Sequence, residues 1–425
     1  MIISKKECLL NYTKKEKKKE KITMKKKTIA KTGATMLTMA MLLNGTTVFA
    51  AETGYTGVAG TTTSFDKYLV MDKQANVPNA TFTYAVKAGT AKAYDVDGKK
   101  FQVLAGVDAD KITMDGVGTT TKNTIAYAST DSTLNDENTM VKNYDKGTEK
   151  YAKKTATLDL SAVQFTEPGV YRYIITESGT NQAITNDADL TRVLDVYVDD
   201  ATGTDGVKKL KIAGYVLHAS EDEITSGENF GTTATDPTGK SQGFTNEYDT
   251  SDLTFKKEVA GNQASHDKYF RFTVNITDAV PGTVYTVDID NADATSNRNA
   301  ATITANAEKV NVTSMTVGAD GTISQDFYLQ HGQEIKIQGI AKDTKYEVTE
   351  NKEDYKSEAK AVTGYADEVS GTIASTDLKT SYKNTRSGVI PTGVIMAVAP
   401  FAAVTLLGAV GMVTIKMRKK EDDEE

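Results

Sequence analysis

Two sets of three polar residues recur in the same order along the chain, each residue within a short apolar segment. The sets are Lys67, Glu177 and Asn246, and Lys257, Glu350 and Asn384. Burial lowers the pKa of a lysine and raises that of a glutamate, so a buried pair can exchange a proton. The neutral amine can then attack the asparagine amide while the acid moves protons, which yields a Lys–Asn isopeptide bond and ammonia. Each set could therefore crosslink its own part of the chain without an external enzyme.

The flanking residues predict that all six side chains point into a hydrophobic core, since residues two apart on a strand face the same side. The apolar neighbours at this spacing are Phe65 and Leu69 for Lys67, Phe255 and Val259 for Lys257, Ile175 for Glu177, Val348 for Glu350, Phe244 and Tyr248 for Asn246, and Tyr382 for Asn384. Unpaired buried charges are very costly, so the members of each set are expected to meet. Lys256 competes with Lys257, but the alternation points it outward.

A simpler interpretation exists for each set: a Lys–Glu ion pair at a strand end, with the asparagine exposed in a turn. That interpretation suits any one of these residues taken alone. The ordered recurrence on inward faces favours the crosslink.

The elements that must position these residues are β-strands. Apolar residues alternate with polar ones over 270–276, which is typical of a half-buried strand, and similar short runs recur between turn residues. No long stretch has the helical period. The sequence predicts an all-β protein of two tandem antiparallel sandwich domains, with domain one at residues 51–248 and domain two at 249–386.

The first 50 residues are predicted to be removed. They hold 12 lysines and three acidic residues, a net charge of +9. From Met24 onward, three lysines, an apolar run and small residues follow in the order of a secretory signal peptide, with cleavage after Ala50. Residues 1–23 fit no part of such a signal and are interpreted as an upstream extension.

Residues 51–392 are strongly acidic, with 34 basic and 49 acidic side chains and a net charge of −15. This charge disfavours nucleic acid as a partner. Cys8 is the only cysteine of the 425 residues, so the exported part has no disulfide and no cysteine-bound metal. The three histidines follow no metal-ligand spacing, and neither a metal nor a cofactor is predicted.

The C-terminal region, residues 387–425, combines three features in order. Ile390, Pro391, Thr392 and Gly393 come first. Residues 394–415 then carry no charge and are long enough to cross a bilayer transiently. A basic stretch follows, made of Lys416, Arg418, Lys419 and Lys420.

This order resembles the sortase sorting signal of Gram-positive surface proteins. The two sets of three polar residues are called triads below. Together with these triads, the sorting signal makes the chain resemble two-domain backbone (shaft) pilins with immunoglobulin-like domains of the collagen-binding-protein B type. The resemblance implies crosslinks Lys67–Asn246 and Lys257–Asn384, with Glu177 and Glu350 as catalytic acids. It also implies cleavage after Thr392, polymerisation by sortase with neighbouring pilin subunits, and attachment to peptidoglycan in a cell-surface pilus. Pro391 directly precedes Thr392, whereas the commonest sorting motif has one residue between its proline and its threonine. This difference leaves the sortase class open.

The resemblance also implies a lysine that accepts the next subunit. Lys240, six residues before Asn246, is the best match, although the usual motif around such a lysine is absent and Lys240 could equally be an ordinary exposed lysine. Its rivals are Lys208, Lys209 and Lys211. The leading hypothesis is thus a structural shaft subunit rather than an enzyme. The alternative is a wall-anchored adhesin or minor pilin that binds a host or matrix ligand, and a hydrolase of surface polymers is the third.

Overall fold

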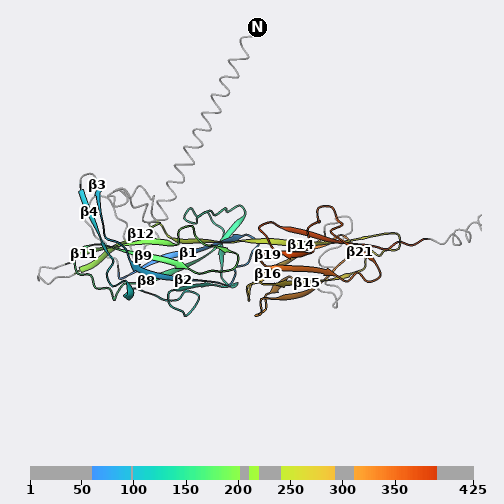
Figure 1. The fold of residues 1–425 in the computed structure, drawn as a ribbon, viewed down its shortest axis with the longest axis horizontal. Helices are drawn as coiled ribbons and strands as arrows, with labels where there is room; N and C mark the ends of the chain where they lie inside the picture. Colours follow the sequence, from blue (N-terminus) through green and yellow to red (C-terminus); the bar gives the residue numbers. More distant parts are fainter. Residues whose placement is uncertain (1–59, 97–98, 202–209, 220–240, 292–310, 390–425) are drawn as a thin grey trace, which may run out of the picture.

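A computed structural model describes residues 60–96, 99–201, 210–219, 241–291 and 311–389. These residues form an elongated molecule in which two pairs of β-sheets lie end to end (Figure 1). The predicted signal peptide, Lys240, residues Ile390–Gly393 and the span 394–415 lie outside the described residues. Within the described ranges, no helix is long and apolar enough to span a bilayer.

The first sheet pair is built from residues 62–248. One sheet has the order β10 (Ile184–Thr185), β13 (Gly243–Tyr248), β1 (Thr62–Asp72), β8 (Glu149–Asp159) and β5 (Thr113–Met114), with β7 (Thr133–Leu134) also paired to β8. The facing sheet has the order β12 (Leu210–His218), β11 (Thr191–Asp200), β9 (Gly169–Ser178), β2 (Ala80–Ala88) and β6 (Thr124–Tyr127), with β4 (Lys99–Ala105) on β9 and β3 (Lys92–Val96) on β4. A 3-10 helix, η1 (Ala109–Lys111), precedes β5.

The second sheet pair is built from residues 250–385. One sheet has the order β17 (Ser314–Thr316), β16 (Val284–Asn291), β19 (Gln333–Ala341), β14 (Thr250–Ala260), β23 (Leu378–Thr385) and β21 (Lys356–Ala359). The facing sheet has the order β18 (Ile323–Leu329), β15 (Phe270–Thr277), β20 (Lys345–Glu350) and β22 (Ser370–Thr372). The prediction of an all-β protein is therefore confirmed. The immunoglobulin-like type of the domains and their exact limits stay predictions.

The first and last strands of each sheet pair lie side by side and parallel. In β1 and β13, Leu69 pairs with Asn246, and in β14 and β23, Val259 pairs with Asn384. Each asparagine thus lies opposite the residue two positions after its lysine. The side chains of a pair at this offset face the same side of the sheet, which brings lysine and asparagine together.

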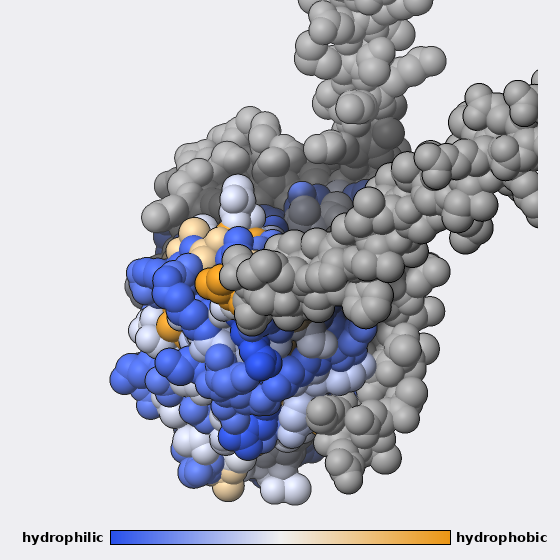
Figure 2. Space-filling view, turned by 90° about the vertical axis from the view of Figure 1, so that its right-hand side faces the viewer, coloured by the Kyte–Doolittle hydropathy of each residue, from blue (hydrophilic) through white to orange (hydrophobic). Residues whose placement is uncertain are grey.

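Each sheet pair encloses its own hydrophobic core. Phe65, Phe82 and Phe244 belong to the first core, and Phe255 and Phe272 belong to the second, all with at most 2% of their surface exposed. Among the described residues, the large hydrophobic side chains that are exposed are Leu134, Leu190 and Val389. Figure 2 views the end that is remote from the first sheet pair, and the described residues visible there are mostly hydrophilic.

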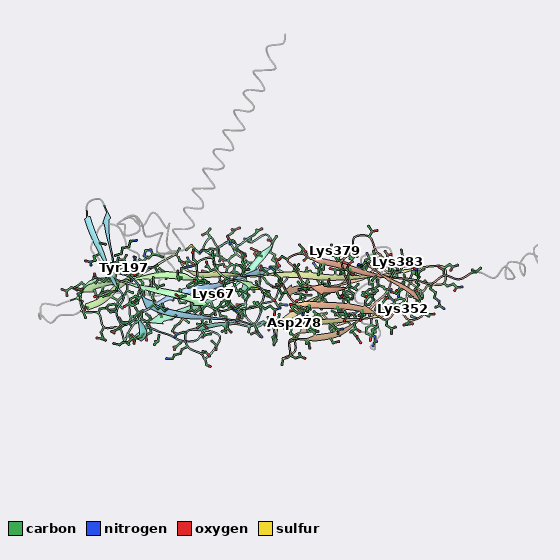
Figure 3. All side chains as sticks on the ribbon, in the orientation of Figure 1. Lys67, Tyr197, Asp278, Lys352, Lys379 and Lys383 are labelled. Atoms are coloured by element: carbon green, nitrogen blue, oxygen red, sulfur yellow. The ribbon has the colours of Figure 1, made fainter. Side chains whose placement is uncertain are left out.

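The two sheet pairs contact each other closely, because Asp249 alone separates β13 from β14. Asn76 Nδ2 donates to the Val284 carbonyl at 2.9 Å, and Gln182 Nε2 donates to the Asp278 carbonyl at 2.7 Å. Figure 3 places Asp278 at this junction. Gly339 has a φ of +67°, and a Cβ there would lie 2.6 Å from the backbone of Ala75, so the junction requires glycine at this position.

Candidate functional site

The structure brings the first predicted triad together inside the first core. Lys67 on β1 places its Nζ 2.9 Å from each carboxylate oxygen of Glu177 on β9. Asn246 on β13 donates its Nδ2 to Oε1 of the same glutamate, also at 2.9 Å. At most 2% of any of the three residues is exposed, and Figure 3 shows Lys67 within the first sheet pair. The lysine nitrogen and the asparagine amide therefore meet at one glutamate oxygen.

The second predicted triad has the same arrangement. Lys257 Nζ on β14 contacts Oε1 of Glu350 on β20, and Asn384 Nδ2 on β23 donates to that oxygen at 3.1 Å. The side chains of Lys257 and Glu350 are fully buried. Lys256 lies over the ring of Tyr365 at 5.0 Å, so it does not compete for Glu350.

Both buried lysines have a low pKa. Burial lowers the pKa of Lys67 to about 8, against the opposing charge and hydrogen bond of Glu177, and the same balance with Glu350 lowers the pKa of Lys257 to about 8. Each Nζ lies 4.2 Å from the centroid of a phenylalanine ring, that of Phe82 or Phe270. A pKa of about 8 leaves roughly one tenth of the lysine neutral at pH 7. Both sites can therefore supply a nucleophilic amine.

A hydroxyl group holds the second oxygen of each glutamate. The Tyr84 hydroxyl donates to Oε2 of Glu177 at 2.6 Å, and the Ser357 hydroxyl donates to Oε2 of Glu350 at 2.8 Å. Burial raises the pKa of Tyr84 well above its usual value, so it remains a donor. Neither residue was predicted from the sequence. Tyr84 could have been found, because it lies two residues after Phe82 on the same inward face.

In the described part of the chain, further polar contacts to the asparagine are found at the first site. Asn246 Oδ1 accepts from the peptide N–H of Asp187 at 3.1 Å, and Asn246 Nδ2 also donates to Oδ1 of Asn186 at 3.1 Å. The Asp187 carboxylate in turn accepts from Arg192 Nη2 at 2.5 Å. At the second site, Asn384 Oδ1 is buried and has no hydrogen-bond partner within the described part of the chain. The two triads are alike, but their surroundings differ.

One histidine lies close to the second triad: His331 Nδ1 accepts from the peptide N–H of Val259 on β14, two residues after Lys257, at 2.9 Å. His218 Nε2 is 3.2 Å from Asp195 Oδ2, and His266 stacks on His331 with ring centroids 4.1 Å apart. In the described ranges, no group of three or more His, Cys, Asp or Glu side chains could hold a metal ion.

Similarity to known proteins covers both sheet pairs. Over 408 residues, the chain is 26% identical to a protein named Pilin from Streptococcus pyogenes serotype M1, a match that covers 89% of this chain and 98% of that pilin. The resemblance to a pilin is confirmed. Residues 251–386 of this chain also match a family described as a domain of unknown function, DUF7601, and these residues contain the whole second triad.

Two solved structures are similar to the chain as well. The major pilin from Streptococcus pyogenes is 19% identical, with a TM-score of 0.47, and the match covers 78% of this chain and 100% of that one. The major pilin T3.2 from Streptococcus pyogenes serotype GAS13637 is 19% identical, with a TM-score of 0.45, over 77% of this chain and 100% of that one.

Proposed function

We propose that this chain is the shaft subunit of a surface pilus. On this proposal the exported chain is polymerised by a sortase and is finally attached to peptidoglycan. Each sheet pair closes an internal Lys–Asn isopeptide bond, Lys67–Asn246 in the first and Lys257–Asn384 in the second. The similarity to a pilin over nearly the full length of both chains supports the structural role.

One observation carries the proposal of internal crosslinks. In both sheet pairs, a lysine Nζ and an asparagine Nδ2 contact the same glutamate oxygen in a buried site. An ion pair alone would not require the asparagine at that oxygen, nor the same arrangement twice.

The chemistry follows from these contacts. The Lys67 ammonium passes a proton to Glu177, which leaves a neutral amine and a carboxylic acid. Nζ attacks Cγ of Asn246, and a proton from Nζ reaches Nδ2 through Glu177. The Cγ–Nδ2 bond breaks, ammonia leaves and Glu177 remains protonated. Fixed proximity replaces an external catalyst. Glu350 has the corresponding role for Lys257 and Asn384.

The bonds join the first strand of each sheet pair to the last. The joined residues are 179 positions apart in the first pair and 127 in the second. If the bonds restrict the unfolded chain as disulfides do, each stabilises by about 4–5 kcal/mol. In the first sheet pair, β1 and β13 are adjacent and parallel, and the Lys67–Asn246 bond would join them directly. A force that pulls these two strands apart would then act on this covalent bond rather than on the hydrogen bonds of the sheet.

The linkage between subunits involves residues outside the described ranges. Sortase would cleave after Thr392 and transfer its carbonyl carbon to a lysine of the next subunit, with Lys240 as the first candidate. Among the rivals, Lys211 lies on β12, where it pairs with Asp199, so its backbone is already held in a sheet.

The crosslinks are tested by the intact mass of residues 51–392. We expect the mass to fall below the sequence mass by two ammonia molecules. Asn246→Ala and Asn384→Ala should each restore one of them. Asn311→Ala is the matched control, because Asn311 is buried but lies in neither triad. A wild-type protein of full sequence mass would overturn the proposed crosslinks.

Polymerisation is tested separately on cell-wall extracts. The wild-type chain should give a ladder of high-mass species that collapses in Lys240→Ala and persists in Lys211→Ala. A ladder that survives Lys240→Ala would place the linkage on another lysine. A wild type that gives no ladder would contradict the shaft role and would favour the wall-anchored adhesin or minor pilin.

A further inference from the structure

The amide of Asn246 is held at both of its polar atoms. The peptide N–H of Asp187 donates to Oδ1, while Nδ2 donates one hydrogen to Glu177 and the other to Asn186. Asp187 is 5% exposed and Asn246 is 1% exposed, so water does not compete freely for these bonds. The oxygen that would gain negative charge during crosslinking thus already faces a hydrogen-bond donor.

The peptide at Asp187 is anchored through its own side chain. The carboxylate accepts from Arg192 at 2.5 Å and from the peptide N–H of Thr245 at 2.9 Å. Burial would raise the pKa of Asp187, but the charge of Arg192 and the backbone donors outweigh it and hold the pKa below its usual value. Asp187 is therefore a charged anchor inside the protein.

Arg192 is itself fixed on several sides. Its Nε donates to the Gly243 carbonyl at 2.7 Å, and its guanidinium carbon lies 4.5 Å from the centroid of the Phe244 ring. Gly243, Phe244 and Asn246 all lie on β13. Arg192 and Asp187 therefore tie the donating peptide to the strand that carries the reacting amide.

We propose that the peptide N–H of Asp187 stabilises the oxyanion that forms on Asn246 during crosslinking, and that Asn186 orients the departing nitrogen. This proposal rests on the crosslink proposed above. As the Nζ–Cγ bond forms, the carbonyl electron pair moves to Oδ1, and the N–H of Asp187 holds that charge. The carbonyl then re-forms, the Cγ–Nδ2 bond breaks and ammonia leaves with the proton that Glu177 delivers. Arg192 is a positioning residue, since it acts through Asp187.

The second site has no such donor within the described residues, where Asn384 Oδ1 lacks a hydrogen-bond partner. An oxyanion donor accelerates acyl transfer by about 10²–10³-fold. The Lys67–Asn246 bond should therefore form faster than the Lys257–Asn384 bond within the same molecule. The second bond is an internal reference for every experiment on the first.

The direct test removes only the N–H. The full chain is made by cell-free synthesis with the α-hydroxy analogue of aspartate at position 187, so that an ester oxygen replaces the peptide nitrogen. Crosslinks are then followed in time by mass mapping of the two linked peptides. We expect the first bond to form about 100-fold more slowly and the second at an unchanged rate. An unchanged rate for the first bond in the folded ester variant would overturn the proposal.

Side-chain variants test the anchor. Arg192→Gln should slow the first bond by between about 10- and 100-fold, because small displacements of a catalytic group have effects of this size. Arg192→Lys should recover part of the rate, and Asn186→Ala should slow the bond by roughly tenfold. Arg172→Gln is the matched control: Arg172 is equally buried and pairs with Asp195, on the face of β9 opposite to that of Glu177.

A purely structural role for Arg192 is distinguished in a Lys67→Met background, where no first bond can form. The stability lost through Arg192→Gln is measured there, and the crosslinking rate is measured on folded molecules only. If Arg192→Gln destabilises the fold but leaves that rate unchanged, the positioning role is wrong. If the wild-type chain forms no Lys67–Asn246 bond at all, the proposed function fails instead.

Discussion

The two triads share one geometry but lie beside different edge strands. In the first sheet pair, β10 pairs with β13 only through Ile184 and Thr185, and the chain then leaves the sheet. The next two residues, Asn186 and Asp187, are free of the strand ladder and turn their polar groups to the side chain of Asn246.

In the second sheet pair, β21 stays paired with β23 beside the asparagine, and Ser357 lies directly opposite Asn384. The backbone of β21 is used by the sheet, so it offers a side-chain hydroxyl to Glu350 rather than a peptide N–H to Asn384. The comparison indicates that the triad depends on the register of the first and last strands. The polar surroundings of its asparagine depend on where the neighbouring edge strand ends.

The largest expected effect is the loss of either proposed isopeptide bond. Asn246→Ala and Asn384→Ala should each lower the free energy of unfolding by about 4–5 kcal/mol, measured by denaturant unfolding above pH 10.5, where the freed lysine is mostly neutral in both the folded and the unfolded chain. The difference in loop length changes this value by only about 0.3 kcal/mol, so the two losses should be nearly equal. Asn311→Ala, outside both triads, is the control. A loss at one site that is several times the loss at the other would contradict the view that both bonds stabilise by closing a loop.

The next largest effect is a pH dependence of the free energy of unfolding, which is expected only where the crosslink is absent and the lysine amine is free. In Asn246→Ala, Lys67 keeps a free amine whose pKa is about 8 in the folded chain, below its value of 10.5 in the unfolded chain. The unfolded state therefore binds more protons between these values, and the free energy of unfolding should rise by about 3 kcal/mol from pH 8 to pH 10.5. Below pH 8 the cost of burying the charged lysine is present in full.

Denaturant unfolding at a series of pH values measures this rise. The double variant Lys67→Met with Asn246→Ala should lack it, since no amine remains in the site. Asn384→Ala should show a similar rise through Lys257, whose pKa is also about 8. If only one of the two variants shows the rise, burial does not lower the pKa of the two lysines in the same way.

Much of each site could be predicted from the alternation of residues. The sequence places Lys67 and Lys257 as charged residues on otherwise apolar strand faces. The structure brings each lysine to its predicted glutamate and asparagine. Arg192 gives the same signal, because Leu194 and Val196 continue its face, yet it was missed. Its partners include an aspartate and backbone carbonyls, so it belongs to no repeated set of three residues that would draw attention to it.

Other parts could not be predicted in this way. The contact of Asp187 with Asn246 uses a peptide N–H, which every residue except proline carries, so no residue type marks it. Ser357 reaches Glu350 because β21 adds to the edge of the sheet, which is a long-range pairing. The junction depends on Gly339 and on amide contacts between residues that are far apart in sequence.

A smaller effect is expected from the hydroxyl at the first site. Tyr84→Phe removes the donor to a buried carboxylate oxygen while it keeps the ring, and should cost about 2 kcal/mol. The measurement is denaturant unfolding in the Asn246→Ala background, where no crosslink masks the change. Tyr144→Phe is the control, because its hydroxyl bond to Asn135 is exposed. A loss no larger than that of the control would mean that Glu177 does not depend on this hydroxyl.

The smallest effect is expected from the hydroxyl at the second site. Ser357 is partly exposed, so water can replace its hydroxyl at Glu350, and Ser357→Ala in the Asn384→Ala background should cost only about 1 kcal/mol. Ser324→Ala, which removes an exposed hydroxyl bond to Asn275, is the matched control for denaturant unfolding. A loss that equals or exceeds that of Tyr84→Phe would reverse the order of the two sites. Glu350 would then depend on its edge strand as strongly as Glu177 depends on the buried tyrosine of the facing sheet.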